Sequence, residues 1–284
     1  MMTLNNPTAD GFVPQQGLAL DAALSRTTHL GIGAHQDDLE FGALPGILDC
    51  FGQPDRWFTG ITCTDGGGSP RAGVYADYTD DQMKAVRVEE QRTAAMVGRY
   101  SAMLQLGYPS SRIKDSADPG LKDELVALFE ASRPSVIYTH NPADKHATHV
   151  AVFNAVLQAL RERPQTERPQ AVYGVEIWRG LDWMPDEKKV VLPVDGHDHL
   201  IASLQGVFDS QIAGGKRYDL AAAGRYRSNA TFFASHGVDT TSNLVYAMDL
   251  MPLVENPALD PADYVIGLMR ETEAAIRQQI LEVS

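Results

Sequence analysis

The chain has 284 residues, 44% of them hydrophobic and 21% charged, so it is long enough to bury the core of one α/β domain. Its 24 Lys and Arg residues against 37 Asp and Glu residues give a formal charge of −13. That charge disfavours nucleic acid and anionic membranes as partners. The first residues lack a secretory signal, and no apolar run reaches the roughly 20 residues that span a bilayer. With only two cysteines, Cys50 and Cys63, we expect a cytoplasmic protein.

Apolar runs alternate with helical patterns after a polar leader that ends near Gln16. This alternation is typical of strand–helix–strand units and predicts a Rossmann-like, mostly parallel sheet flanked by helices. We expect one α/β domain over residues 27–284, preceded by an N-terminal extension over residues 1–26. The expected strands are Thr28–Ala34, Trp57–Thr64, Ala102–Leu106, Val136–Thr139, Ala171–Ile177 and Lys189–Pro193.

Helical patterns separate these strands, and the C-terminal one carries the clearest signals. Asp260 can cap that helix and Pro261 suits its first position. Its apolar residues form a stripe that we expect to pack on the domain. The expected helices are Leu39–Cys50, Asp81–Gly98, Lys122–Ser132, His146–Arg161, His199–Ala213 and Pro261–Leu281, and the stripe consists of Val265, Leu268, Met269, Ile276 and Ile280.

Two junctions between a strand and the next helix are rich in polar side chains. Ligands of open α/β sheets bind where strands end and helices begin, so such junctions are informative. In the first junction, His35, Asp37 and Asp38 directly follow an apolar strand. In the second, residues 139–149 (THNPADKHATH) follow another strand and contain three histidines and an aspartate. These side chains are of the kinds that bind zinc or a similar divalent ion.

Each junction alone has a simpler interpretation. Asp37 and Asp38 could complement the start of a helix, and His146 and His149 could be core histidines on a stripe with Phe153. The two junctions together change this balance. Two carboxylates and two imidazoles at neighbouring strand ends are costly to bury unless a cation neutralises them. The sequence therefore predicts a metal site.

A dinucleotide-binding loop is a rival interpretation of the first junction, because Gly31 and Gly33 follow a strand. The third glycine of that fingerprint is replaced by Gln36. Two carboxylates would also face the pyrophosphate at the start of the helix and repel it. We therefore do not expect a nicotinamide cofactor.

The two junctions resemble the signatures of the LmbE/PIG-L family of metal-dependent N-deacetylases. Residues 34–40 (AHQDDLE) resemble its Ala-His-Pro-Asp-Asp-x-Glu motif, and residues 144–149 (DKHATH) resemble its Asp-x-His-x-x-His motif. Residues 64–67, 87–90 and 210–211 also match, so the resemblance runs from Thr28 to about Gln211. Gln36 replaces the usual proline, and Ala147-Thr148 replaces the frequent Pro-Asp. Both departures could alter loop rigidity and substrate fit, but neither removes a ligand.

The resemblance implies that His35, Asp38 and His149 bind the metal, Zn²⁺ or another divalent ion such as Fe²⁺. It also implies that Asp37 is the general base. The residue pattern agrees, because a loop turning into a helix can supply two ligands while the opposite junction supplies the third. Such a set leaves a coordination position for water, as a catalytic site requires. Asp37 would then stand beside that water and take its proton.

Three further residues have expected roles. His146 is expected to stabilise the oxyanion and to protonate the leaving amine. Asp144 could orient the His146 ring, cap the following helix, or do both. Arg87 could bind the substrate, or it could form a surface pair with Glu90, one turn further along its helix.

The predicted activity is hydrolysis of an N-acyl group, with an acetylated amino sugar as the leading substrate by resemblance. One alternative is an amidase that acts on a thiol conjugate or a natural-product amide. A second is a metal- or nucleotide-binding module without turnover. The expected partner is a small N-acylated molecule, and a homo-oligomer remains open. The region after Trp178 carries no motif that we interpret, and we expect it to set specificity.

Overall fold

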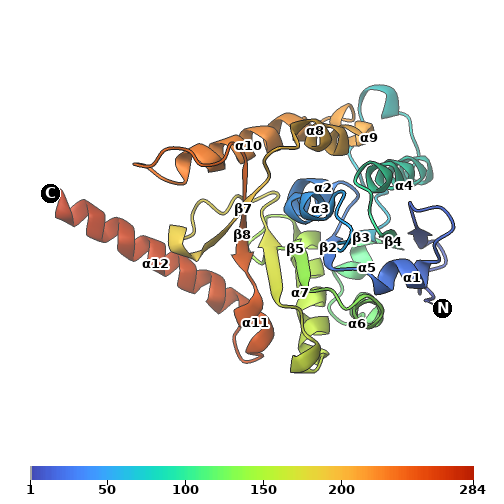
Figure 1. The fold of residues 1–284 in the computed structure, drawn as a ribbon, viewed down its shortest axis with the longest axis horizontal. Helices are drawn as coiled ribbons and strands as arrows, with labels where there is room; N and C mark the ends of the chain where they lie inside the picture. Colours follow the sequence, from blue (N-terminus) through green and yellow to red (C-terminus); the bar gives the residue numbers. More distant parts are fainter. Residues whose placement is uncertain (1) are drawn as a thin grey trace.

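The computed structural model describes residues 2–284, which form an eight-stranded mixed sheet between two layers of helices (Figure 1). The strands are β1 (Asp10–Phe12), β2 (His29–Gly33), β3 (Phe58–Thr64), β4 (Ala102–Tyr108), β5 (Val136–His140), β6 (Ala171–Val175), β7 (Lys189–Pro193) and β8 (Leu244–Asp249). The helices are α1 (Leu20–Ser25), α2 (Asp38–Gly42), α3 (Leu44–Cys50), α4 (Asp80–Val97), α5 (Ser110–Ile113), α6 (Gly120–Ser132), α7 (Ala147–Glu162), α8 (Asp198–Gly206), α9 (Asp209–Ile212), α10 (Tyr218–Phe232), α11 (Met251–Glu255) and α12 (Pro261–Glu282).

The strand order is β1-β4-β3-β2-β5-β6-β8-β7. The neighbours from β4 to β6 pair in parallel, whereas β1, β7 and β8 pair antiparallel with their neighbours. From β2 the chain builds β3 and β4 on one side and returns to build β5 and β6 on the other. The order therefore reverses between β2 and β5, which is where open α/β sheets place their ligands. The prediction of a mostly parallel, Rossmann-like sheet in one α/β domain is confirmed.

Two hydrophobic cores cover the two faces of the sheet, as expected of parallel strands buried on both sides. One core packs α1, α6 and α7 against the sheet, and the other packs α3, α8 and α10 (Figure 1). Every residue of β2 and β3 is buried. No helix of residues 2–284 combines the length and the apolar character needed to cross a membrane.

Two expected helices are each divided. The segment Leu39–Cys50 forms α2 and α3, which meet at Ala43, and the segment His199–Ala213 forms α8 and α9, with a break around Phe208. Pro45 stands in the first turn of α3, where its missing N–H costs nothing. The other expected helices and all six expected strands are confirmed, with ends shifted by a few residues.

Six elements were not expected from the sequence, among them the short helices α5 and α11. β1 and α1 lie within residues 1–26, where β1 pairs with β4 and α1 buries Ala23 and Leu24. At the other end of the chain, α10 covers the sheet and β8 pairs between β6 and β7. The leader and the C-terminal third therefore both contribute to the sheet and its cover.

The C-terminal helix α12 begins as predicted, because Asp260 accepts hydrogen bonds from the backbone N–H groups of Ala262 and Asp263. The prediction that its whole stripe packs on the domain is wrong. Val265 and Leu268 are buried, but Ile276 is 52% exposed and the end of the helix projects from the body of the molecule (Figure 1). Only the first turns reach the core, because the domain ends beside them.

Candidate metal centre and cavity

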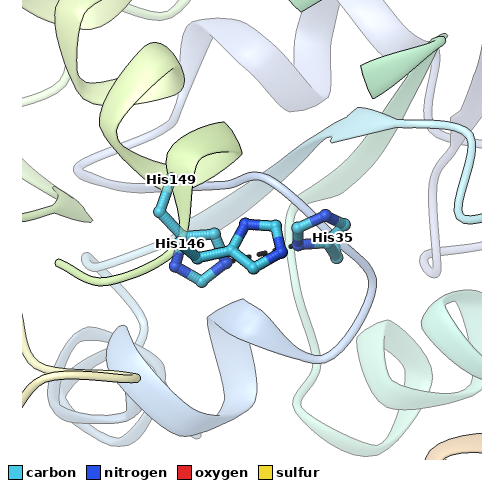
Figure 2. Close-up of side chains that lie close together, drawn as sticks. All are labelled: His35, His146 and His149. Carbon is cyan, nitrogen blue, oxygen red and sulfur yellow. Dashed lines mark hydrogen bonds between the residues drawn. The ribbon is translucent and has the colours of Figure 1, made fainter. Parts of the chain in front are cut away.

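The two predicted junctions meet at the carboxyl ends of β2 and β5, which are neighbours at the reversal of the strand order. His35 and Asp38 follow β2, whereas His146 and His149 stand at the start of α7, after β5. Figure 2 shows the rings of His35, His146 and His149 close together, with a dashed line between His35 and His149. The topology therefore unites side chains that are more than 100 residues apart.

The loop after β2 turns sharply into α2. Asp37 has a φ of 97°. Residues other than glycine rarely adopt this backbone conformation, and it persists only where the surroundings enforce it. A Cβ at Gly33 would lie 2.8 Å from the Asp38 Cβ, so only glycine leaves room for the Asp38 side chain there. One Asp38 oxygen accepts a 2.7 Å hydrogen bond from the His35 backbone N–H. The turn thus points the Asp38 carboxylate back towards the end of β2.

The three predicted ligands lie close together. His35 Nδ1 lies 3.3 Å from His149 Nε2, and the Asp38 carboxylate lies 3.4 Å from each nitrogen through a different oxygen. Ligands of a tetrahedral zinc ion, with bonds of roughly 2.0–2.1 Å, are about 3.3–3.4 Å apart. Each pairwise distance is close to this spacing, although Asp38 makes its two contacts through different oxygens.

A histidine that we did not single out belongs to the same cluster. His140, the last residue of β5, is 1% exposed, and its ring stacks on the His149 ring with 3.8 Å between centroids. Its Nε2 accepts a hydrogen bond from the Ala34 N–H and lies 3.4 Å from Asp38 Oδ2. Two overlapping sets could therefore hold an ion: His35, His146 and His149, or Asp38, His140 and His149.

Burial and charge act in opposite directions on the ionisable groups of the cluster. Burial raises the pKa of Asp38, but His149 and His140 outweigh it and hold the pKa well below its usual value. Burial lowers the pKa of His140 to about 4. For His149, burial is outweighed by Asp38 and Asp144, so the pKa is raised. A carboxylate facing mostly neutral imidazoles is the protonation state that binds a metal ion.

Asp144 does not lie where it was expected. Its Oδ1 is 3.6 Å from His149 Nδ1 and also accepts a 2.8 Å hydrogen bond from the His146 backbone N–H. The Asp144 side chain thus faces the ring of His149, whereas among residues 2–284 the His146 Nδ1 has no hydrogen-bond partner. Asp144 is also not the N-cap of α7, because that position is His146 itself. A carboxylate behind a histidine is the usual way to orient a metal ligand.

Asp37 is held by groups other than those that surround Asp38. Its backbone N–H donates to Gln91 Oε1 over 3.2 Å, and Gln91 Nε2 donates to Glu40 over 2.8 Å. Its carboxylate lies 3.6 Å from the Arg87 guanidinium. Burial raises the pKa of Asp37 well above its usual value, and Arg87 counteracts only part of that effect. Two adjacent aspartates therefore have different surroundings.

Arg87 is 3% exposed, so the alternative of a surface pair with Glu90 is wrong. Its guanidinium donates to the Gln36 carbonyl and to the Ser69 hydroxyl, and it faces Asp37. Glu90 instead accepts hydrogen bonds from the N–H and the hydroxyl of Ser210. Arg87 holds the loop after β2 and also reaches the cavity beside it.

A cavity of about 640 Å³ opens beside the cluster. His35, Asp37, Asp38 and His146 lie in its wall, together with residues of the C-terminal third. The Trp178 ring is nearly parallel to the His146 ring at 6.4 Å, and Tyr218 of α10 meets Trp178 edge-on at 5.8 Å. The region after Trp178 therefore supplies one wall of the cavity, and a small organic molecule would fit between that wall and the cluster.

The chain is similar to known deacetylases. Residues 30–160 match the PIG-L family, described as GlcNAc-PI de-N-acetylase. The chain is 29% identical over 148 residues to the uncharacterized deacetylase YaiS of Escherichia coli K12, a match that covers 51% of this chain and 75% of that protein. Residues 30–160, which match the family, contain every predicted metal ligand, the predicted base and Arg87.

The solved structures that share the fold include a hydratase and a deacetylase. The 4-carboxy-2-hydroxymuconate hydratase GalB of Pseudomonas putida KT2440 has a TM-score of 0.60 at 15% identity, covering 79% of this chain and 96% of its own. The N,N'-diacetylchitobiose deacetylase of Pyrococcus horikoshii has a TM-score of 0.59 at 14% identity, covering 78% and 83%. Because one is a hydratase and the other a deacetylase, the shared fold alone does not select the reaction.

Proposed function

Because residues 30–160 match the PIG-L family of de-N-acetylases, we propose that the chain hydrolyses the N-acyl group, first of all an acetyl group, of an amino sugar or a similar amine. The observation that carries this proposal is the position of Asp37. Its carboxylate lines the same cavity as His35, Asp38 and His146, yet it pairs with Arg87 rather than with the histidines. A site that only stored a metal ion would have no use for this second carboxylate.

In this proposal His35, Asp38 and His149 hold a divalent ion, Zn²⁺ or one such as Fe²⁺. The pairwise distances of 3.3–3.4 Å between their donor atoms support this set. A divalent ion bound there would supply Lewis acidity, which eases the deprotonation of water and polarises an amide carbonyl. Asp144 keeps the His149 ring in the orientation in which Nε2 faces the ion.

The chain's own residues then move the protons. Asp37 accepts a proton from the attacking water, and burial raises its pKa, which makes its carboxylate a stronger base. His146 donates a proton to the amine nitrogen as the C–N bond breaks, because an unprotonated amine leaves poorly. Burial and the neighbouring histidines lower the pKa of His146, which makes its protonated ring the stronger acid. Arg87 keeps Asp37 in place and reaches the substrate cavity.

Acetate release tests the proposal. The protein is loaded with Zn²⁺ or with Fe²⁺ and incubated with N-acetylated amino sugars, with an N-acetylated thiol conjugate and with an N-acylated natural product. We expect acetate and free amine in equal amounts from the sugars. Release from the other amides alone would indicate the alternative amidase activity. No release from any amide by either metal form, with Asp37 intact and metal bound, would contradict the proposal and favour a binding module.

We also propose a cytoplasmic location, which is supported by two free, buried cysteines, Cys50 and Cys63.

A further inference from the structure

The cavity beside the cluster carries an excess of positive charge in a chain whose formal charge is −13. Of its lining residues, Asp37 and Asp38 belong to the cluster itself. The third acid, Glu176, is 3% exposed and is already occupied by the N–H groups of Leu181 and Tyr246 and by the amide of Asn229. The cations of the lining are Arg87, Lys114, Lys216 and Arg225.

Three of these cations have no acidic partner. Among residues 2–284, no ion pair joins Lys114, Lys216 or Arg225 to a carboxylate. By contrast, at least one ion pair is formed by each of Lys84, Lys122, Lys188 and Lys189. Lys114 and Lys216 are exposed, and Arg225 donates only to the Ile177 carbonyl. Three cations around one cavity that have no acidic partner within residues 2–284 create a positive field that an anionic ligand would neutralise.

The arrangement links Lys216 and Arg225 to the reactive end of the cavity. The Lys216 ammonium lies 4.4 Å from the centre of the Trp178 ring, and that ring stacks near His146. Arg225 stands two turns along α10 from Tyr218, on the face that also presents Ala221 and Ala222 to the cavity. An aromatic and small-residue wall thus runs from His146 towards the cations.

We propose that the substrate carries an anionic group, a phosphate or a carboxylate, on the part of the molecule that remains with the amine. Lys114, Lys216 and Arg225 line the cavity and bind this group. The inference rests on the proposed function, which places the acyl group at the metal. An acetyl group is far smaller than a cavity of about 640 Å³, so most of the substrate extends along the Trp178 and Tyr218 wall. The anionic group then reaches the cations while the amide lies beside Asp37 and His146.

Turnover of matched substrates tests this inference. The metal-loaded protein is assayed with N-acetylglucosamine, with its 1-phosphate and 6-phosphate, and with N-acetylmuramic acid, which carries a carboxylate. We expect kcat/KM to be at least about tenfold higher for an anionic substrate than for the neutral sugar, and the preference to shrink as salt is added. Preference for a phosphate ester assigns a phosphate group, and preference for the muramic acid assigns a carboxylate.

The double variant Lys114→Gln/Lys216→Gln should reduce the ratio of kcat/KM for the anionic over the neutral substrate about tenfold. The control, Lys188→Gln, removes one positive charge from an exposed lysine outside the cavity and should leave that ratio unchanged. Equal kcat/KM values for neutral and anionic sugars in the wild type, or a ratio that survives in the double variant, would overturn the inference.

Calorimetry separates this inference from the proposed function. Glucosamine and glucosamine 6-phosphate are titrated into the wild-type protein and into the double variant. Tighter binding of the phosphorylated amine to the wild type alone would support the anion site even if no amide were hydrolysed. Equal affinities for the two amines would contradict it even if the neutral sugar were deacetylated.

Discussion

Asp37 and Asp38 are adjacent in the chain but face different partners. Asp38 contacts His35, His140 and His149, whereas Asp37 contacts Arg87 and is held through its backbone by Gln91. The unusual φ of 97° at Asp37 separates the two side chains. A division of labour between the two carboxylates follows from this single turn.

Asp37→Asn preserves the shape of the side chain and removes its basicity. We expect this variant to fold and to hold its metal ion but to lose roughly 10²–10⁴ in kcat, the usual contribution of a general base. The matched variant Asp38→Asn should instead lose metal, because it weakens a ligand. Metal content and kcat are measured together for both. Near wild-type turnover of Asp37→Asn would show that another group is the base.

Asp144→Asn tests the contact between Asp144 and His149. Since the carboxylate lies behind the His149 ring, we expect metal affinity to fall about 10–100-fold. His146→Ala is the comparison, because it should keep the metal and flatten the basic limb of the pH–rate profile. Competition with a chelator measures the affinities. If Asp144→Asn kept full metal affinity and changed only the basic limb of the pH–rate profile, Asp144 would orient the ring of His146 and not that of His149.

At the scale of single residues, the sequence could predict the cluster but not its internal contacts. His35, Asp38 and His149 lie in the junctions that follow two strands, and sheet topology brings such junctions together. His140 was counted among the histidines of the second junction but was given no role, because one histidine at the end of a buried strand has no spacing that separates a ligand from a packed ring. The partner of Asp144 was wrong because the direction of a loop side chain depends on the fold.

At the scale of elements, strands and helices with a clear apolar period were predicted and others were not. α10 was missed because the face towards the cavity presents Tyr218, Ala221 and Arg225 instead of a continuous apolar stripe. The division into α2 and α3 lies at Gly42-Ala43, which an apolar pattern alone does not mark. The helix that lines the cavity, α10, therefore lacks the apolar pattern that made other helices predictable.

The two halves of α12 should differ in their contribution to stability. Leu268 is 5% exposed, so Leu268→Ala should lower the free energy of unfolding by about 2 kcal/mol or more. Ile276→Ala is the control on the same stripe, and because Ile276 is 52% exposed we expect a change within about 0.5 kcal/mol. Urea unfolding measures both variants. Equal losses would show that the projecting half packs against something in solution.

At the scale of the whole molecule, metal binding should stabilise the fold. A ligand that binds only the folded state at 100 times its Kd adds about 2.7 kcal/mol, which raises Tm. We expect Tm of the metal-free protein to rise on addition of Zn²⁺, and the rise to be lost in His149→Ala. Arg217→Gln, an exposed variant outside the cluster, should retain it. An equal rise in His149→Ala would place the bound ion elsewhere.

The separation of His35 and His149 by 114 residues also bears on how the molecule is made. β2 leaves the ribosome long before β5, and β5 pairs with it in parallel only after the intervening strands and helices have been synthesised. Closing so long a segment of chain is slow compared with local folding. A nascent chain that ends before β5 offers His35 and Asp38 alone, too few donors to retain an ion. At the proposed metal site, acquisition of the ion would therefore be a late event in biogenesis, and an ion held tightly would mark a chain whose central strands are already paired.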